Sequence, residues 1–478
     1  PDYTCTKGRW DELPEEEFRG AEAKKRHELP VMAAEERVRT FDETTGCWDA
    51  RTAMAEAGRC LSCGCSERYD CQLRGYASSY GVTFDKTAPR PRPLPVDDSH
   101  PILVRDSGKC ILCGLCLKVC REMEGSAALS FSEVGSRLTI GPNDGRPLEK
   151  TTCVSCGHCV TVCPTGALAF RPVLPEVYRA LHDPMKITAA QIAPAVRAAL
   201  AEKYGVSGEE AMKRLCAGLR LVGFDYVFDT CFTADLTIME EGTEFLSRVS
   251  SGQRLPQFTS CCPAWVQYCE KVAPDLLNLL SSCKSPQQMF GAVVKEYFAK
   301  QIDVQRERLH FVSIMPCNAK KYEAKRPEFA KDGSADVDTV LTTNDILQMF
   351  EEKNVDFLAL EPRELDQPFG KVSGAGIIFG ASGGVSEAAL RLAADKISGE
   401  RLENVEYEDV RGLKGIKEAR VRIGDKTVRV AVVSGLQNAQ RLIDRIRGGD
   451  IAYDLIEVMA CPGGCINGSG NPAPKLDE

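Results

Sequence analysis

The sequence predicts an α/β protein in which mostly parallel strands are flanked by helices, preceded by two cysteine-rich regions. From about residue 180 onward, strand-like segments alternate with helical ones, the pattern of a parallel sheet with crossover helices. Cysteine motifs follow two of these strands, at the edge where open α/β sheets usually hold their sites. Upstream, two similar cysteine runs form an internal repeat. We therefore predict three domains, at residues 1–95, 96–175 and 176–478.

The individual elements are assigned from their apolar periods and lengths. The predicted strands are 186–193 (KITAAQIA), 309–315 (LHFVSIM) and 428–435 (VRVAVVSG). The predicted helices are 48–60 (WDARTAMAEAGRC), 344–353 (NDILQMFEEK) and 386–397 (SEAALRLAADKI). The segment 87–101 (TAPRPRPLPVDDSHP) is too rich in proline for a helix or a central strand, so it is interpreted as a linker.

Composition and charge exclude several classes of protein. A hydrophobic content of 43% and a charged content of 27% are ordinary for a globular protein. The formal net charge of −8 argues against nucleic-acid binding, which requires a basic face. No apolar run approaches the roughly 18 residues of a membrane span, and the acidic N-terminus has no signal-peptide core. We therefore expect a cytoplasmic protein that binds neither nucleic acid nor a membrane.

Cysteine is the residue type that departs from the average. The chain has 23 cysteines, mostly in tight clusters, and only 5 histidines. Without an export signal, clustered cysteines indicate metal ligands rather than disulfides. Sites rich in thiolate and poor in histidine favour iron–sulfur clusters over zinc.

Two runs with the spacing C-x2-C-x2-C-x3-C predict a pair of 4Fe–4S clusters. In such a run the first three thiolates hold one cluster, and the fourth, displaced by a helical turn, reaches the other cluster. We assign the first cluster to Cys110, Cys113, Cys116 and Cys163. We assign the second cluster to Cys153, Cys156, Cys159 and Cys120. Zinc would leave this crossed set of thiolates unexplained.

A third cysteine group lies near the N-terminus. Its members are Cys60, Cys63, Cys65 and Cys71, which suit either zinc or a third 4Fe–4S cluster. We favour the cluster, because electron-transfer clusters follow downstream. The surrounding residues EAGRCLSCGC and CQLRGYASSYG resemble the iron–sulfur segments of glutamate synthase small-chain-type flavoproteins. Cys5 and Cys47 have no evident partner and are interpreted as unligated thiols.

The C-terminal region carries three further cysteine motifs. They are TSCCPAW (Cys261, Cys262), MPCNAKKYEA (Cys317) and EVMACPGGCINGSG (Cys461, Cys465). One helical turn would place Cys461 and Cys465 on the same face. We expect the glycines of the last motif, Gly463, Gly464, Gly468 and Gly470, to let the backbone approach a bulky inorganic body. Cys262, Cys317, Cys461 and Cys465 are sufficient ligands for another 4Fe–4S cluster, which leaves Cys261 over.

The three motifs, in this order after a region that is similar to a two-cluster ferredoxin, resemble those of the iron–iron hydrogenases. The resemblance extends from about residue 100 to the end and includes QIAPAVRAAL, DYVFDTCFTADLTIMEEGTEF, LSSCKSPQQMFG and GAGIIFGASGGVSEAALR. It implies a two-lobed catalytic domain for reversible dihydrogen oxidation and proton reduction. It also implies an H-cluster, in which a 4Fe–4S cubane is joined through Cys465 to a two-iron unit bearing CO, cyanide and a dithiolate amine.

The resemblance implies a role for further residues. Cys261 would pass protons to the dithiolate amine, and Glu241, Glu244 and Ser281 would form the proton path to it. Lys320 would hold a cyanide ligand as a hydrogen-bond donor. The residues implied to pack around the two-iron unit or line its pocket are Met315, Met459, Ala193, Pro194 and Gln287. Taken without the resemblance, the two glutamates would be interpreted as solvated and the two methionines as core.

Local chemistry agrees with the implied role of Cys261. Pro263 suits the first position of a helix. A thiol just before a helix N-terminus is expected to have a lowered pKa. The family often has three glycines where this chain has Gly468, Ser469 and Gly470, a change that we expect to leave binding intact. Four cysteines match no ligand position and are predicted to be buried thiols: Cys216, Cys231, Cys269 and Cys283.

The sequence has no G-x-G-x-x-G after a strand and no Walker A motif, so we expect neither flavin nor nicotinamide to bind. The stretch GAGIIFGASGG is expected instead to give close backbone packing near the cofactor. Electrons would come from a ferredoxin or from a flavoprotein subunit using NADH or NADPH, in a hetero-oligomer. Two alternatives remain: a slow redox or hydrogen sensor, and a non-catalytic iron–sulfur assembly factor. The complete set Cys261, Glu241, Glu244 and Ser281 favours the enzyme, and an assembly factor would have no use for Lys320.

Overall fold

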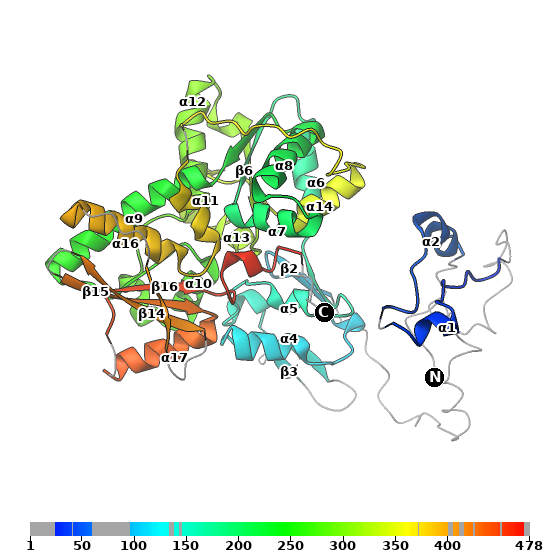
Figure 1. The fold of residues 1–478 in the computed structure, drawn as a ribbon, viewed down its shortest axis with the longest axis horizontal. Coiled ribbons are helices and arrows are strands. Elements are labelled where there is room, and N and C mark those ends of the chain that lie inside the picture. Colours follow the sequence, from blue (N-terminus) through cyan, green and yellow to red (C-terminus); the bar gives the residue numbers. More distant parts are fainter. Residues whose placement is uncertain are drawn as a thin grey trace. The chain divides into compact units, whose positions relative to one another are not determined.

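The computed structural model describes residues 24–40, 42–59, 96–132, 138–142, 146–370, 372–399, 405–410, 415–423, 426–449 and 452–472. Contacts divide the chain into two units, Pro1–Pro93 with Gly135–Arg137, and Leu94–Val134 with Leu138–Glu478 (Figure 1). No helix among the described residues is long and apolar enough to cross a membrane.

The described part of the first unit contains two short helices, α1 (Ala34–Arg37) and α2 (Ala50–Ala57). Helix α2 begins after Asp49, whose side chain accepts a hydrogen bond from the N–H of Thr52. The helix predicted at 48–60 is therefore confirmed over its middle residues. The N-terminal cysteine group from Cys60 to Cys71, like Cys5, lies outside the described residues.

The second unit begins with the region of the cysteine repeat, and the repeat is visible in the backbone. Leu112 and Gly114 in the first run, and Ser155 and Gly157 in the second, all have positive φ angles, of 58°, 77°, 57° and 83°. Each glycine leads into a short helix, α4 (Leu115–Lys118) or α5 (His158–Thr161). The two runs therefore fold in the same way, as two halves of one motif.

Short antiparallel strands close this region. Their bounds are β1 (Val96–Asp97), β2 (Leu103–Asp106), β3 (Ser130–Ser132), β4 (Thr139–Gly141) and β5 (Leu168–Phe170). Strands β1, β2 and β5 form one sheet, and β3 pairs with β4. The first run continues from α4 into a π-helical turn, η3 (Val119–Met123).

A parallel sheet forms one lobe of the C-terminal region. Its order is β12 (Thr339–Thr342), β9 (Leu309–Met315), β6 (Ile187–Ile192) and β7 (Tyr226–Asp229). Strands β6, β9 and β12 are buried almost throughout, as expected for a parallel sheet that is covered on both faces. The strands predicted at 186–193 and 309–315 are confirmed.

The second lobe contains a mixed sheet. Its order is β13 (Glu408–Asp409), β14 (Ile416–Ile423), β15 (Lys426–Ser434), β16 (Leu455–Met459) and β8 (Gln257–Phe258). Strands β15, β16 and β8 are parallel, and β14 is antiparallel to β15. The strand predicted at 428–435 is confirmed as β15. The α/β class and its mostly parallel strands are thus confirmed, with the antiparallel strands at one edge.

Helices cover both sheets. They are α6 (Leu174–His182), α7 (Pro194–Tyr204), α8 (Gly208–Val222), α9 (Cys231–Ser251), α10 (Pro263–Lys271), α11 (Pro286–Val293), α12 (Ala299–Gln301), α13 (Ala319–Glu323), α14 (Thr343–Glu352), α15 (Gly374–Ile377), α16 (Gly384–Ser398) and α17 (Leu436–Arg447). Helices α14 and α16 confirm the predictions at 344–353 and 386–397, and α14 begins with a capping box of Thr342 and Asp345. Helix α9 packs against α11 of the first lobe and α16 of the second, and so connects them (Figure 1).

Candidate active site

A cavity lies where the carboxyl ends of β6, β9 and β16 meet, with about 910 Å³ of empty space when its opening to solvent is included. It is lined by Cys156, Ala193, Pro194, Ala195, Thr230, Ala234, Cys261, Cys262, Pro263, Ala264, Pro286, Gln287, Met315, Pro316, Cys317, Ala319, Lys320, Phe379, Gly380, Met459, Ala460, Cys461 and Cys465. The structure therefore brings the predicted pocket residues and all five cysteines of the C-terminal motifs into one cavity, called the central cavity below.

The cysteines reach the central cavity from three loops. Cys262 is the N-cap of α10, while Cys317 and Cys461 follow β9 and β16. The helical turn expected between Cys461 and Cys465 is wrong. The chain turns instead through Gly463 and Gly464, at φ angles of 79° and 100°, before Cys465 starts a short 3-10 helix.

The glycines of the last motif serve to pack protein against protein. A Cβ on Gly468 would lie 2.2 Å from the carbonyl oxygen of Pro316, and one on Gly464 would lie 2.6 Å from the amide nitrogen of Ser382. Contacts with the Cys317 loop and with the GAGIIFGASGG stretch are thus a reason for glycine at these two positions, and the approach of the backbone to an inorganic body stays a prediction. In the GAGIIFGASGG stretch the expected close packing is confirmed, since a Cβ on Gly384 would lie 1.9 Å from the carbonyl oxygen of Ile378.

Three helices direct their N-termini at the central cavity, and only the start of α10 was predicted from the sequence. Helices α7, α10 and α11 each begin with a proline at the first position, and Pro194, Pro263 and Pro286 all line the cavity. Proline is favoured there because its missing N–H would have no helical partner. The partial positive charge at each N-terminus favours an anionic group in the cavity.

The predicted lowering of thiol pKa values next to the α10 N-terminus is wrong. Burial raises the pKa of Cys261 well above its ordinary value, and the charge of Glu241 raises it further, against the opposing charge of Lys320. Burial also raises the pKa of Cys262, although hydrogen bonds from the backbone of Ala460 and Trp265 oppose it. Desolvation thus outweighs the helix, so Cys261 carries its proton at neutral pH.

Lys320 is held at the cavity wall by a buried acceptor that sequence reasoning missed. Its Nζ donates to the carbonyl oxygen of Cys261 at 3.0 Å and to Glu323 Oε2 at 3.0 Å. Glu323 also accepts from Ser285 Oγ and Gln287 Nε2, both at 3.0 Å. Burial lowers the pKa of Lys320, but the charge of Glu323 prevails and raises it. Lys320 is therefore a fixed ammonium, and its position three residues before Glu323 was the available signal.

The glutamates of the predicted proton path lie on α9, one turn apart. Glu241 is buried, and burial raises its pKa to about 7. Glu244 Oε2 accepts from Ser281 Oγ at 3.1 Å and from the N–H of Ser282 at 2.9 Å. Burial acts to raise the pKa of Glu244, but hydrogen bonds from Ser282 and the hydrogen bond and charge of Arg248 lower it. Glu241, which titrates near neutrality, therefore lies one helical turn from Glu244, which is ionised at that pH.

Arg248 completes this arrangement and was also missed. Its guanidinium lies 2.5 Å from Glu244 Oε1 and donates to the carbonyl oxygens of Leu279 and Leu280 at 2.9 and 2.7 Å. It lies four residues after Glu244 on α9, a spacing that could have identified it. Because Arg248 is itself buried, it fixes the orientation of Glu244 and of the loop that carries Ser281.

Glu241→Gln should remove a pH-dependent penalty to stability. With a pKa near 7 in the folded protein and about 4.3 in the unfolded chain, Glu241 binds more protons when folded. The free energy of unfolding of the parent should therefore fall as the pH rises through that window, by up to about 4 kcal/mol. Relative to the parent, the variant should gain thermal stability between pH 5 and pH 8, as measured by melting temperature. The exposed neighbour supplies the control, since Glu240→Gln should follow the parent at both pH values.

The eight cysteines of the repeat line two further cavities, in the crossed pattern that was predicted. The outer cavity, about 430 Å³, is lined by Cys110, Cys113, Cys116 and Cys163. The inner cavity, about 350 Å³, is lined by Cys120, Cys153, Cys156 and Cys159. Cys156 lines both the inner and the central cavity, so the two are neighbours.

The remaining described cysteines line none of these cavities. Cys216, Cys231 and Cys269 are buried, as predicted, whereas Cys283 is only partly buried and Cys47 is exposed. Burial raises the pKa of Cys283 to about 12, and the charge of Glu241 contributes to this shift. Cys283 is therefore near enough to Glu241 of the predicted proton path to sense its charge. None of the described cysteines forms a disulfide.

The residues present fit an anionic iron–sulfur cofactor in each cavity. The four proposed cubane thiols are unpaired by disulfides and meet in a largely apolar space faced by helix N-termini and Lys320. Gln287 Oε1 is buried and has no hydrogen-bond partner among the described residues, so the wall offers a polar contact that the protein does not use.

Comparison with known proteins agrees with this chemistry. The family model "Iron only hydrogenase large subunit, C-terminal domain" matches residues 186–469, and "4Fe-4S dicluster domain" matches residues 106–167. The chain is 44% identical over 424 residues to the NADP-reducing hydrogenase subunit HndD of Solidesulfovibrio fructosivorans, covering 85% of this chain and 71% of that protein. It is 33% identical over 380 residues to the cytosolic iron-sulfur assembly component 3 of Bos taurus, covering 74% and 80%.

A solved structure is similar as well. The apo [FeFe]-hydrogenase HydA1 from Chlamydomonas reinhardtii superposes with a TM-score of 0.58 at 40% sequence identity, covering 63% of this chain and 85% of that one. The family model spans more than half of the chain, and the fold and the thiol-lined cavity agree with it. The chain therefore belongs to the iron-only, or FeFe, hydrogenases.

Proposed function

We propose that the chain catalyses reversible dihydrogen oxidation and proton reduction at an H-cluster in the central cavity. The observation that carries this proposal is the convergence of Cys262, Cys317, Cys461 and Cys465 with Cys261 and Lys320 in one cavity. The four cysteines that line the inner cavity and the four that line the outer cavity would each hold a 4Fe–4S cluster, which would supply electron transfer to and from the H-cluster. When bound, the two-iron unit supplies the open metal position at which dihydrogen is formed or split.

We assign the remaining chemistry to the chain's own side chains. Cys261 holds a proton at the cavity wall, since burial keeps its thiol protonated. Glu241 replaces that proton because its pKa near 7 lets the carboxyl both accept and release at neutral pH. Ser281 and Glu244 continue the path toward solvent. Lys320 presents its ammonium to an anionic ligand of the cofactor, and Met315 and Met459 exclude water beside it.

The similarity to an assembly component raises the alternative of a non-catalytic factor. That role would not need a protonated thiol beside the four proposed ligands. It would not need an ammonium fixed by Glu323 or a buried carboxyl with a pKa near 7 either. The presence of all three groups favours the enzyme.

An infrared spectrum of anaerobically matured protein tests the proposal. Bands from metal-bound CO and cyanide should appear together with hydrogen uptake and evolution. A fully matured protein that contains iron but shows no such bands would overturn it. Bands without measurable turnover would favour a sensor.

We further propose that the N-terminal unit receives electrons from a partner. The relative from Solidesulfovibrio fructosivorans is named as a subunit of an NADP-reducing hydrogenase. With the flavoprotein-like N-terminal motif, this supports a hetero-oligomer with a flavoprotein subunit that uses NADH or NADPH; a ferredoxin is the alternative donor. Cys60, Cys63, Cys65 and Cys71 would hold a third 4Fe–4S cluster. The many free cysteines suit a reducing compartment such as the cytoplasm.

Deleting residues 1–93 should separate electron entry from catalysis. We expect activity with a small artificial donor to persist, because such a donor reaches the outer cluster directly. Activity with the protein partner should fall at least tenfold, and the iron content should fall by about four atoms per chain. Loss of one zinc in place of that iron would show that the N-terminal cysteines bind zinc. Equal loss of activity with both donors would indicate a folding role for the unit.

A further inference from the structure

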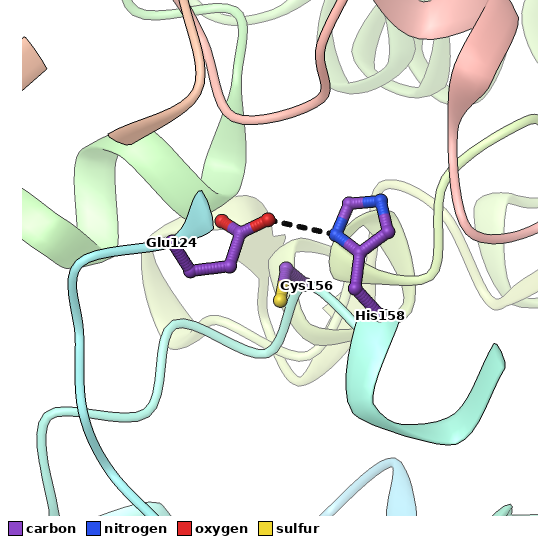
Figure 2. A group of neighbouring side chains, drawn as sticks. All are labelled: Glu124, Cys156 and His158. Atoms are coloured by element: carbon purple, nitrogen blue, oxygen red, sulfur yellow. Dashed lines mark ion pairs between the residues drawn. The ribbon is translucent and has the colours of Figure 1, made fainter. Parts of the chain in front are cut away.

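A buried ion pair lies beside the inner cavity, and neither of its residues has a role in the function proposed above. Glu124 directly follows the π-helical turn η3 and is 0% exposed, while His158 is the first residue of α5 and is 8% exposed. His158 Nδ1 lies 2.8 Å from Glu124 Oε1 (Figure 2). Among the described residues, neither oxygen of Glu124 accepts a hydrogen bond, so the imidazole of His158 is the basic group that faces this carboxyl.

The pair lies close to the inner cluster's proposed ligands. Glu124 lines the inner cavity, and the polar atoms of Glu124, Cys156 and His158 all lie within 4.8 Å of one another (Figure 2). Cys156 also faces the central cavity. Glu124 and His158 therefore lie beside a proposed ligand of the inner cluster that also lines the central cavity.

A mononuclear metal site is the competing interpretation of this group. A carboxylate, a thiol and an imidazole at such spacing could hold a single ion. However, Cys156 shares the inner cavity with Cys120, Cys153 and Cys159, which together make the four thiolates of a 4Fe–4S cluster. If Cys156 is a ligand of that cluster, its sulfur is not available to a separate ion. The carboxylate of Glu124 and the imidazole of His158 then pair with each other.

A carboxylate and an imidazole beside a cluster affect it through their charges. The reduction potential of a 4Fe–4S cluster depends on nearby charge, hydrogen bonds and solvent exposure. A carboxylate disfavours the added electron and an imidazolium favours it, and both effects are strong where water is excluded. Removing one partner of a buried pair leaves the charge of the other uncompensated.

We propose that Glu124 and His158 set the reduction potential of the inner 4Fe–4S cluster relative to the H-cluster, Glu124 lowering that potential and His158 raising it. The proposal rests on the assignment of the inner cluster to Cys120, Cys153, Cys156 and Cys159. Both residues are positioning groups that act through the cluster, because neither is among its four proposed ligands. The pair thereby controls how an electron is shared between the inner cluster and the H-cluster.

Redox titration of the full matured chain, monitored by electron paramagnetic resonance, tests the proposal. The inner cluster's signal is the one lost in Cys153→Ser. Glu124→Gln should raise its potential and His158→Gln should lower it. We expect each shift to be at least about tenfold in the one-electron equilibrium constant, or 59 mV. The double variant, in which the pair is again neutral, should return close to the parent. The exposed control Glu122→Gln should shift the potential much less.

The outcomes distinguish the alternatives. Shifts of the same sign in both single variants, or no shift, would overturn the proposal and leave the pair a structural contact. Loss of one non-iron metal ion per chain in both single variants would establish the mononuclear site instead. If a single variant fails to assemble the inner cluster, the reduction potentials of the double variant and of Glu122→Gln test the proposal instead. A double variant displaced as far as Glu124→Gln, or a control that shifts equally, would overturn the proposal. Failure of the proposed function would appear separately, as missing CO and cyanide bands in the parent.

Discussion

Cys261→Ala should assemble the H-cluster and lose most of its turnover, whereas Cys262→Ala should lose the cluster itself. The two residues are adjacent and both line the central cavity, yet the structure gives them different surroundings. Cys262 is the N-cap of α10 and receives hydrogen bonds from the backbone of Ala460 and Trp265, as suits a thiolate ligand. Cys261 faces the charges of Glu241 and Lys320 instead.

The expected magnitudes follow from these roles. Cys262→Ala removes one of four cubane ligands, so little or no CO and cyanide absorption should remain. Cys261→Ala keeps the four ligands and should retain the bands, while hydrogen evolution falls by about a hundredfold or more, the usual contribution of a positioned proton donor. Cys261→Asp should lie between Ala and the parent, because a carboxyl also exchanges protons but differs from a thiol in pKa and reach.

The measurements are hydrogen evolution and infrared spectra on the same samples, with iron content as a check on maturation. Cys269→Ala is the control, since it removes a buried thiol of α10 that lines none of the three cysteine-lined cavities. It should keep both the bands and the turnover. A Cys261→Ala protein with full bands and the parent rate would mean that this thiol is not the proton donor.

Local patterns account for the parts of the fold that could be predicted. The strands predicted at 186–193, 309–315 and 428–435 are apolar runs bounded by polar or turn residues. Strands β6 and β9 form within their predicted ranges, and β15 begins two residues before its predicted range. Because β9 and β16 are parallel to neighbouring strands, Cys317 and Cys461 each lie at the carboxyl edge of their own sheet, where α/β sheets usually hold their sites. That the two edges face one cavity depends on how the two lobes pack, which local patterns do not predict.

Contacts between distant segments account for what the sequence could not predict. Glu323 is held by Ser285 and Gln287 from another helix, and no local period reports that pairing. The pKa of Cys261 depends on how deeply the loop is buried, so the helix rule alone predicted the wrong direction. Glu124 and His158 lie in different halves of the cysteine repeat, so their contact could not be predicted from the spacing of the cysteines.

Glu241→Gln should resemble Cys261→Ala in both assays, with the H-cluster assembled and hydrogen evolution reduced about a hundredfold or more. The charge of Glu241 raises the pKa of Cys261, and the charge of Glu244 raises that of Glu241, so the carboxyl of Glu241 interacts electrostatically with both groups. Glutamine has nearly the same volume and can occupy the same buried position. Its amide cannot take up and release a proton near pH 7, which is the property that burial gives the carboxyl.

The matched control is Glu240→Gln, which removes the same charge from the exposed face of α9 and should leave turnover unchanged. A second test combines Glu241→Gln with Cys261→Ala. If the two residues act in series on one proton path, the double variant should be no slower than the slower single variant, because the path is already broken. Hydrogen evolution of all three proteins, normalised to the infrared bands, measures this. Losses that multiply in the double variant would place Glu241 and Cys261 on separate routes and contradict the single path.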